Sequence, residues 1–193
     1  MTLAFIRHGQ TDWNLEQRLQ GSTDIPLNDT GRQQAREAVA RLAGTDWEVI
    51  VSSPLSRARE TASIIAEGLG IELGPAYDEL RERDYGDGEG ATAEDIATKW
   101  PDKQYPGLES LESVATRGRA ALDRIDAEFG DRNTLIVCHG TIIRYTLASL
   151  AGREFEQIRN GSVATFERVG EEWRVLTVND EPLTEVVSYR TAE

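Results

Sequence analysis

Short apolar runs alternate along the chain with longer segments whose apolar residues recur every three or four positions. The continuous runs predict buried strands at 3–7, 48–52 and 134–138, with a shorter strand at 71–73. The segments with helical spacing predict helices at 31–44, 54–67, 92–100, 110–129 and 141–151. Two further apolar segments, 163–168 and 173–178, flank Gly170 and predict a closing hairpin.

Strands that alternate with helices predict an α/β fold. We expect a three-layer sandwich with a mainly parallel central sheet, helices on both faces and an antiparallel edge from the hairpin. The length of 193 residues suits a single domain, 1–193. Residues 78–108 are rich in glycine and proline, and we expect them to form an inserted cap or lid segment. Residues 180–193 are expected to form a loosely held tail.

Charge and cysteine content narrow the classes of function. The net charge of −13, from 21 basic and 34 acidic side chains, argues against a nucleic-acid partner. Because this net negative charge repels anions, any phosphate ligand must be held by a local cluster of arginines and neutral donors. The single cysteine, Cys138, rules out an internal disulfide and indicates a reducing compartment. With no apolar run near the roughly 20 residues of a membrane span and no signal peptide, we expect a cytoplasmic protein without a membrane partner.

The only two histidines occupy equivalent places in the pattern. His8 and His139 each follow an apolar strand, and each precedes a glycine. In a parallel sheet, ligands bind beyond the carboxyl ends of the strands, so both imidazoles should emerge at one edge and face each other. Two unrelated structural histidines are the alternative. We favour function because the matched pair uses every histidine in the chain.

Arginines are expected at the same edge. Arg7 precedes His8, and Arg57 lies near the start of the helix that follows the second strand, where free N–H groups also favour an anion. A guanidinium presents a fork of donors suited to phosphate oxygens. A neutral imidazole can attack phosphorus, and the arginines and second imidazole can stabilise the transition state. The acid that protonates the leaving group is left open among Asp78, Glu79, Glu82 and Asp84.

Four sequence blocks carry a family resemblance. They are Arg7-His8-Gly9-Gln10-Thr11-Asp12-Trp13-Asn14, Ser52-Ser53-Pro54-Leu55-Ser56-Arg57-Ala58, Leu80-Arg81-Glu82-Arg83-Asp84-Tyr85-Gly86 and Val137-Cys138-His139-Gly140. In this order they resemble the histidine phosphatase superfamily, also called phosphoglycerate mutase-like, over essentially residues 3–150. The chain is most similar to its shorter phosphatase-type branch.

The resemblance implies a role for each matching position. His8 would be the nucleophile that forms a phosphohistidine, and Glu82 would be the general acid and base. Arg7, Arg57 and His139 would bind the phosphoryl group, helped by Asn14 and the backbone of Gly140. Other substrate contacts would come from Gln20, Gly21, Arg83, Tyr85 and Thr141. The resemblance implies no metal and no other cofactor. The partner would be a small phosphorylated metabolite, and a homodimer is left open.

The remaining choice is between hydrolysis and phosphoryl transfer. A cofactor-dependent phosphoglycerate mutase must rebind a highly anionic bisphosphate, which needs additional basic residues in the cap. Here Lys99 and Lys103 are the only bases in residues 86–116, where seven acidic side chains oppose them. We therefore predict a phosphatase acting on small-molecule phosphomonoesters, with the mutase as the alternative.

Three other interpretations compete with this one. The run Cys138–Arg144 fits the C-x5-R pattern of cysteine-dependent phosphatases, in which a thiolate attacks phosphorus. A metal site formed by the two histidines and nearby carboxylates is the second interpretation, but the arginines beside the histidines would repel a cation. A non-catalytic binding protein on the same fold is a remote alternative, because such proteins normally lose the nucleophile or an arginine.

Overall fold

The main sheet has seven strands in the order β3-β2-β4-β1-β5-β6-β9. The computed structural model describes residues 1–130, 132–170, 172–183 and 188–190. The strands of this sheet are β1 (Thr2–Arg7), β2 (Val49–Ser52), β3 (Leu73–Ala76), β4 (Thr134–Cys138), β5 (Val163–Val169), β6 (Glu172–Val175) and β9 (Ser188–Arg190). A separate two-stranded sheet contains β7 (Thr177–Val178) and β8 (Glu181–Pro182).

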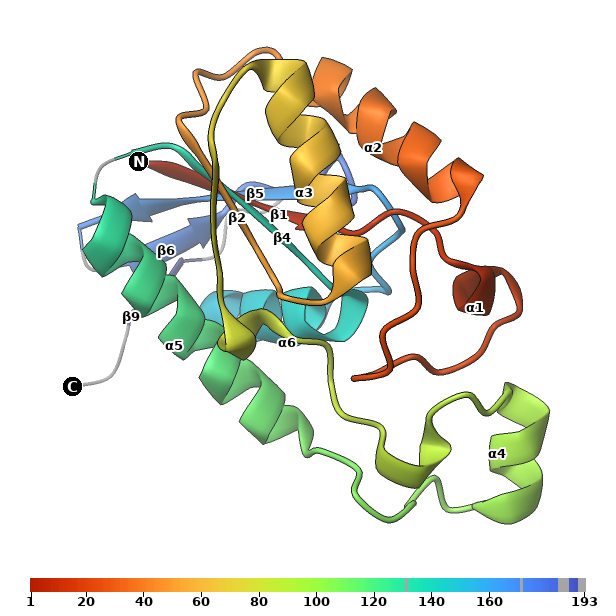
Figure 1. Cartoon of the computed structure of the whole chain (residues 1–193). Coiled ribbons are helices and arrows are strands. Elements are labelled where there is room, and N and C mark those ends of the chain that lie inside the picture. Colours follow the sequence, from red (N-terminus) through yellow and green to blue (C-terminus); the bar gives the residue numbers. More distant parts are fainter. Residues whose placement is uncertain (131, 171, 184–187, 191–193) are drawn as a thin grey trace.

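Helices pack on both faces of the main sheet (Figure 1). One face is covered by α2 (Asp29–Leu42) and α3 (Ser56–Leu69), the other by α5 (Leu111–Phe129) and α6 (Gly140–Ala151). Alternate residues of β1 explain this arrangement, because successive side chains of a strand point to opposite faces. Leu3 and Phe5 belong to the core beneath α5 and α6, whereas Ala4 and Ile6 pack against α2 and α3. The predicted three-layer α/β sandwich is confirmed.

The parallel strands β1, β4 and β2 end at the same level of the sheet. Strand β4 lies between β1 and β2 and is parallel to both, with Arg7 opposite Cys138 and Ser52 opposite Val137. The residues that follow these strands therefore leave the sheet at one edge. Strands β5, β6 and β9 pair antiparallel beyond β1, so the predicted antiparallel edge is also present.

Several element boundaries differ from the sequence predictions: the strand expected at 173–178 is divided into β6 and β7, which lie in different sheets, and two further differences have a local cause. Pro54 was expected in the first turn of a helix, but α3 begins at Ser56 with Leu55 as its N-cap residue. Leu55 has no side chain that can cap the helix, and the Ser56 amide donates a hydrogen bond to the Asp24 carboxylate at 2.9 Å. The strand expected at 71–73 lies at Leu73–Ala76 and includes Pro75. It forms one edge of the sheet, where a proline that cannot donate a hydrogen bond is tolerated.

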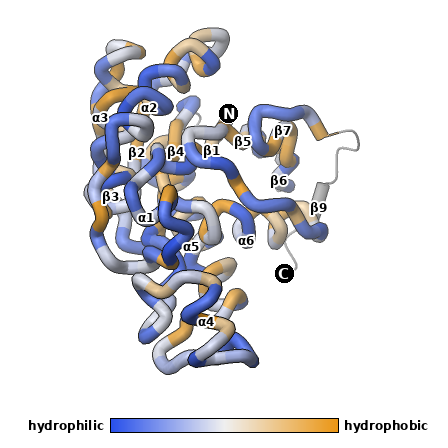
Figure 2. Tube along the Cα trace, turned by 90° about the vertical axis from the view of Figure 1, so that its right-hand side faces the viewer, coloured by the Kyte–Doolittle hydropathy of each residue, from blue (hydrophilic) through white to orange (hydrophobic). Residues whose placement is uncertain are grey.

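The segment predicted as a cap contains three short elements: η1 (Asp78–Leu80), η2 (Gly86–Gly88) and α4 (Ala93–Lys99). The part that includes α4 projects from the sandwich in both overall views (Figures 1 and 2). The other short helix, α1 (Asp12–Leu15), follows His8. Within the described residues, none of the helices combines the length and apolar character needed to cross a membrane.

The part of the predicted tail that the structure describes contains two short strands. Glu181–Pro182 pair with β7, and Ser188–Arg190 pair with β6 at the edge of the main sheet. The rest of the predicted tail, at 184–187 and 191–193, lies outside the described residues.

Candidate active site

Both histidines lie beyond the carboxyl ends of parallel strands and face each other. The His8 amide donates to the carbonyl of Cys138 at 2.9 Å, which continues the β1–β4 pairing by one residue. The two imidazole rings are 5.0 Å apart between centroids and tilted by 59°. His8 is 3% exposed, and His139 is fully buried. The structure thus brings the two histidines together as predicted.

The local backbone fixes the tautomer of His8. Its Nδ1 lies 2.7 Å from the carbonyl oxygen of Gly9. A carbonyl can only accept, so Nδ1 carries the proton and Nε2 keeps its lone pair. Burial lowers the pKa of His8 well below its usual value, and the positive charges of Arg57 and Arg7 lower it further. The ring is therefore neutral at pH 7 and can act as a nucleophile.

The glycine after His8 is required by packing. A Cβ atom at Gly9 would lie 2.2 Å from the carbonyl oxygen of Gly31, in the first turn of α2. That distance is far inside van der Waals contact, and the obstacle is backbone that cannot rotate away. The Gly9 amide also donates to the Thr61 hydroxyl on α3 at 3.1 Å. The loop that orients His8 is therefore fixed by direct contact with two helices.

His139 offers a second imidazole with one nitrogen free. Its Nε2 lies 2.8 Å from the Ser53 hydroxyl, and its Nδ1 has no hydrogen-bond partner among the described residues. Burial lowers the pKa of His139 well below the usual value, with further contributions from Arg57 and His8. If the Ser53 hydroxyl donates to Nε2, the free Nδ1 carries the proton and can donate to a ligand.

Two guanidinium groups flank the histidines, one of them half-buried (Arg7) and the other buried (Arg57). Arg57 is fully buried, and its terminal nitrogens donate to the carbonyls of Thr23 and Gly21, each at 2.8 Å. Arg7 donates to the carbonyl of Ile158 at 2.6 Å. Burial lowers the pKa of Arg57 to about 10, which leaves it charged at pH 7. The Nε atoms of both Arg7 and Arg57 are buried without a partner among the described residues.

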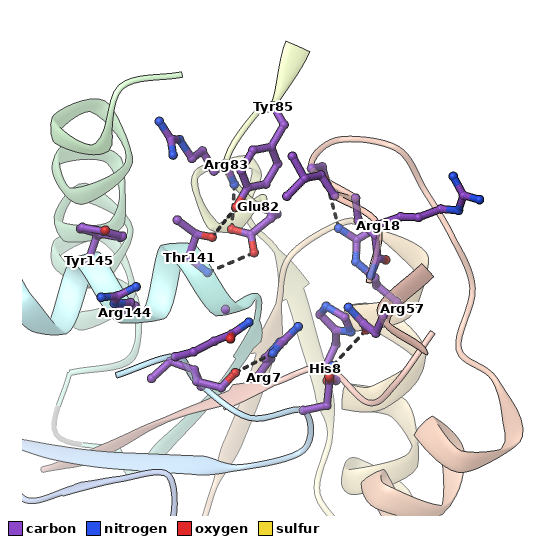
Figure 3. A pocket seen from close by; sticks show the side chains of 18 of the residues that line it. Arg7, His8, Arg18, Arg57, Glu82, Arg83, Tyr85, Thr141, Arg144 and Tyr145 are labelled. Atoms are coloured by element: carbon purple, nitrogen blue, oxygen red, sulfur yellow. Dashed lines mark hydrogen bonds between the residues drawn. The ribbon is translucent and has the colours of Figure 1, made fainter. Parts of the chain in front are cut away.

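Glu82 is held at the start of α6. Its carboxylate accepts from the amides of Thr141 and Ile142, at 3.1 and 3.2 Å, and from the Arg83 amide at 2.8 Å. These α6 amides lie in the first turn, where helical partners are absent and a negative charge is favoured. Figure 3 shows this contact beside the Tyr85 hydroxyl, which lies 2.8 Å from Thr141 Oγ1. Of the four acids left open by the sequence, Glu82 alone lines the cavity described next.

These groups surround a cavity of about 600 Å³. His139 is fully buried and does not line the cavity. The lining includes all the other residues that the sequence assigns to the site: Arg7, His8, Asn14, Gln20, Gly21, Arg57, Glu82, Arg83, Tyr85, Gly140 and Thr141. Gly140 allows the helix to pass close to Arg7, because a Cβ atom there would lie 3.3 Å from Arg7 Nε. The predicted site residues other than His139 therefore share one pocket.

The structure adds residues that sequence reasoning missed. Asn160 donates to the carbonyl of His8 at 3.0 Å and to Asn14 Oδ1 at 3.1 Å, from a loop 152 positions away. The dipeptide Asn160-Gly161 signals a turn, but no local pattern connects that turn to His8. Other lining residues outside the predicted set are Gln17, Arg18, Leu19, Leu111, Arg144, Tyr145, Gln157 and Ile158.

The lining of the cavity is basic, although the protein as a whole is acidic. Within the described residues, its lining holds one acidic side chain, Glu82, and five arginines: Arg7, Arg18, Arg57, Arg83 and Arg144. A chain with a net charge of −13 thus provides a local basic surface for an anion. This arrangement is what the sequence analysis required of a phosphate site.

The competing thiol is poorly placed for attack. Cys138 is fully buried, and it packs in the core cluster that includes residues of α5 and α6. Burial raises the pKa of this thiol, so the reactive thiolate is disfavoured at neutral pH. Cys138 also does not line the cavity, although Arg144 at the end of the C-x5-R pattern does.

Comparison with known proteins identifies the class. A sequence profile of the histidine phosphatase superfamily (branch 1) matches residues 3–181, and the chain belongs to this family. It is 39% identical over 181 residues to the uncharacterized phosphatase PhoE of Bacillus subtilis (strain 168), covering 92% of this chain and 93% of that protein. Relatives that are named as phosphatases support the interpretation of this protein as a phosphatase.

A solved structure and a second relative extend the comparison. A mycobacterial glucosyl-3-phosphoglycerate phosphatase, solved with VO3, superposes with a TM-score of 0.85 at 31% identity, covering 92% of this chain and 98% of that one. Phosphoglycerate mutase-like protein 4 of Arabidopsis thaliana is 36% identical over 195 residues, covering 92% of this chain and 84% of that protein. The fold is thus shared with proteins named for hydrolysis and with one named for its likeness to mutases.

Proposed function

We propose that this protein hydrolyses small-molecule phosphomonoesters through a phosphohistidine intermediate on His8, with Glu82 as general acid and base. One observation carries the proposal: the Nε atoms of Arg7 and Arg57 and the Nδ1 atom of His139 are buried near His8 without a hydrogen-bond partner in the part of the chain that the structure describes. Leaving buried polar groups unpaired costs about 1–3 kcal/mol each. A tetrahedral oxyanion such as a phosphoryl group would satisfy several of them together.

The first half of the reaction transfers the phosphoryl group to the enzyme. The lone pair on His8 Nε2 attacks phosphorus, so that a P–N bond forms as the ester P–O bond breaks. Glu82 in its acid form gives its proton to the departing alkoxide, which leaves as an alcohol. Arg7, Arg57 and His139 stabilise the charge on the equatorial oxygens.

The second half regenerates the enzyme. The Glu82 carboxylate takes a proton from a water molecule as that water attacks phosphorus. The P–N bond breaks, inorganic phosphate leaves, and His8 returns to its neutral form with Nδ1–H still bonded to Gly9. The Gly9 contact is important in both steps because it keeps the proton off Nε2. No metal ion is needed, since the arginines supply the positive charge.

The position of the basic groups supports hydrolysis over the mutase alternative. Within the described residues, the part of the lining that comes from 86–116 is Leu111 alone, so Arg83 is the one base that the 78–108 segment brings to the pocket. Lys103 lines a different, more apolar cavity, and the Lys99 ammonium lies 5.8 Å from the Trp100 ring centroid. A bisphosphate would therefore find no lysine or arginine from residues 86–116 in the described lining of the pocket.

The decisive experiment traps the intermediate. Protein is mixed with a ³²P-labelled phosphomonoester and quenched in alkali, in which phosphohistidine persists. We expect label on the wild-type protein and none on His8→Ala, whose folding is checked by circular dichroism. A screen of phosphorylated metabolites then scores phosphate release against phosphate transfer, with chelator present. Label retained in His8→Ala would overturn the nucleophile assignment, and transfer without release would favour a mutase.

A further inference from the structure

A buried serine follows β2 and lies beside His139. Strand β4 lies between β2 and β1, so His139 at its end has Ser53 on one side and His8 on the other. The Ser53 amide donates to the carbonyl of Val137 at 2.9 Å, which continues the β2–β4 pairing by one residue. Ser53 and His139 are both fully buried. The fold thus gives one of the two imidazoles a hydroxyl neighbour that has no role in the chemistry proposed above.

The hydroxyl of Ser53 donates its hydrogen to His139. Its oxygen accepts from the Leu55 amide at 3.3 Å and lies 2.8 Å from His139 Nε2. Among the residues that the structure describes, Nε2 is the only partner of this hydroxyl that can accept, and full burial keeps bulk water away. A ring nitrogen that accepts a hydrogen bond carries no proton, so the proton of the neutral ring lies on Nδ1.

The opposite tautomer would leave more polar groups unpaired. With the proton on Nε2, His139 would donate to Ser53, and both the hydroxyl hydrogen and the Nδ1 lone pair would be buried without a partner in the described part of the chain. With the proton on Nδ1, that N–H is the one group of this pair left unpaired within the described residues. Because each unpaired buried polar group costs free energy, the Nδ1–H tautomer is the more stable one.

Two neighbouring groups therefore prepare the two imidazoles for opposite functions. At His8, the Gly9 carbonyl accepts from Nδ1, which leaves a lone pair on Nε2 for attack. At His139, the Ser53 hydroxyl donates to Nε2, which leaves an N–H group on Nδ1. An oxyanion accepts a hydrogen bond from an N–H group and is repelled by a lone pair. Only the Nδ1–H tautomer of His139 can therefore stabilise negative charge while the ring stays neutral.

We propose that Ser53 is a positioning residue that fixes the tautomer of His139, so that its Nδ1–H group can bind an oxygen of the phosphoryl group. The binding of that oxygen rests on the proposed function of the site, whereas the tautomer does not. A serine suits this position because one hydroxyl can accept from the Leu55 amide and donate to His139 at the same time. The adjacent buried serine, Ser52, instead accepts from Arg59 at 3.4 Å.

Nuclear magnetic resonance can measure the tautomer directly, because the chain contains only two histidines. Spectra of the ring nitrogens are recorded on ¹⁵N-histidine-labelled protein at pH 7.5, and His139→Ala assigns the two rings. We expect a protonated Nδ1 and an unprotonated Nε2 in both rings of the wild type. In Ser53→Ala the Nε2–H form of His139 should become populated, whereas Ser53→Thr should retain the Nδ1–H form. Ser52→Ala is the matched control, since it removes the adjacent and equally buried hydroxyl, and it should leave both rings unchanged.

Binding of phosphate tests the consequence of the tautomer. Equilibrium dialysis with ³²P-labelled inorganic phosphate should show binding about tenfold weaker in Ser53→Ala and unchanged in Ser52→Ala. In a His139→Ala background, Ser53→Ala should cause no further loss, because Ser53 acts through the ring.

Three results in the spectra would overturn the proposal. They are an Nε2–H or doubly protonated His139 in the wild type, an unchanged tautomer in Ser53→Ala, and an equal change in Ser52→Ala. Weaker phosphate binding with an unchanged tautomer would identify a structural role and also overturn it. If Ser53→Ala fails to fold, the wild-type spectrum and that of Ser53→Thr still decide. Because the spectra require no turnover, a failure to trap phosphohistidine would contradict the proposed reaction and leave the tautomer standing.

Discussion

Glu89 in the cap segment hydrogen-bonds both the amide and the hydroxyl of Thr23, 66 residues earlier in the chain. Its other carboxylate oxygen accepts from the Ser22 amide at 2.7 Å. The carbonyls of Gly21 and Thr23 hold the terminal nitrogens of Arg57. Glu89 therefore positions Arg57 through the loop between them, although it does not itself line the main cavity.

Because Glu89 positions Arg57, we predict that Glu89→Ala weakens binding of the phosphoryl group. We expect kcat/KM for a simple phosphomonoester to fall by about tenfold or more, with a parallel rise in the inhibition constant of vanadate. Glu89→Gln, which keeps one acceptor, should recover part of both. Asp87→Asn is the matched control because Asp87 is an exposed acid two residues away. Loss of stability with unchanged vanadate inhibition would contradict the positioning role.

Glu82→Gln should affect substrates according to their leaving group. An alkyl phosphate requires a proton on the departing oxygen, so its turnover should fall by about 10²–10⁴-fold. With p-nitrophenyl phosphate the first step needs little protonation. We therefore expect a rapid burst of nitrophenolate equal to the enzyme concentration, followed by slow release of phosphate.

Stopped-flow measurement of that burst distinguishes the two steps. Glu79→Gln serves as the control, since Glu79 pairs with Arg124 and does not line the cavity. Equal slowing of the first step for alkyl and aryl esters would contradict the assignment of Glu82 as the general acid.

The two buried histidines should make the protein less stable in mild acid. Burial and then Arg57 lower the pKa values of His8 and His139 below that of an exposed histidine. Below about pH 6.5 the unfolded chain binds protons that the folded protein does not, so the free energy of unfolding falls as pH falls. At pH 5.5 each histidine contributes a loss of about 1.4 kcal/mol relative to neutral pH.

Chemical denaturation at pH 7.5 and 5.5 measures this loss. Titrating carboxylates also contribute, so the comparison is with His139→Gln, which should show a smaller loss by about the contribution of one histidine. The same pH dependence in wild type and His139→Gln would mean that His139 is protonated in the folded protein.

Alkylation separates histidine from cysteine chemistry. Native protein treated with iodoacetamide should keep its phosphatase activity, because Cys138 is fully buried and burial raises the pKa of its thiol. Protein treated in denaturant should be modified at Cys138, which shows that the reagent is effective. Rapid inactivation of the native protein, prevented by phosphate, would instead favour the C-x5-R interpretation.

Local sequence pattern determined the sandwich and the edge at which chemistry occurs. The apolar runs ending at Arg7, Ser52 and Cys138 are strands because their residues are buried on both faces, and parallel strands present their following residues together. That geometry alone predicts that His8 lies beside His139. The choice of Glu82 among four nearby acids was different, since it depended on a family resemblance and not on a period or a spacing.

Only the tertiary structure decided which distant groups complete the pocket. The contacts of Asn160 with His8 and of Glu89 with Thr23 depend on loops brought together across the chain, and no local period encodes such contacts. The distribution of charge also depends on the tertiary structure. The composition shows an acidic protein, whereas the fold brings five arginines and one carboxylate into the described lining of a single cavity. Sequence pattern fixes the backbone that carries a residue, but the packing of separate elements decides which side chains remain unpaired and available to a ligand.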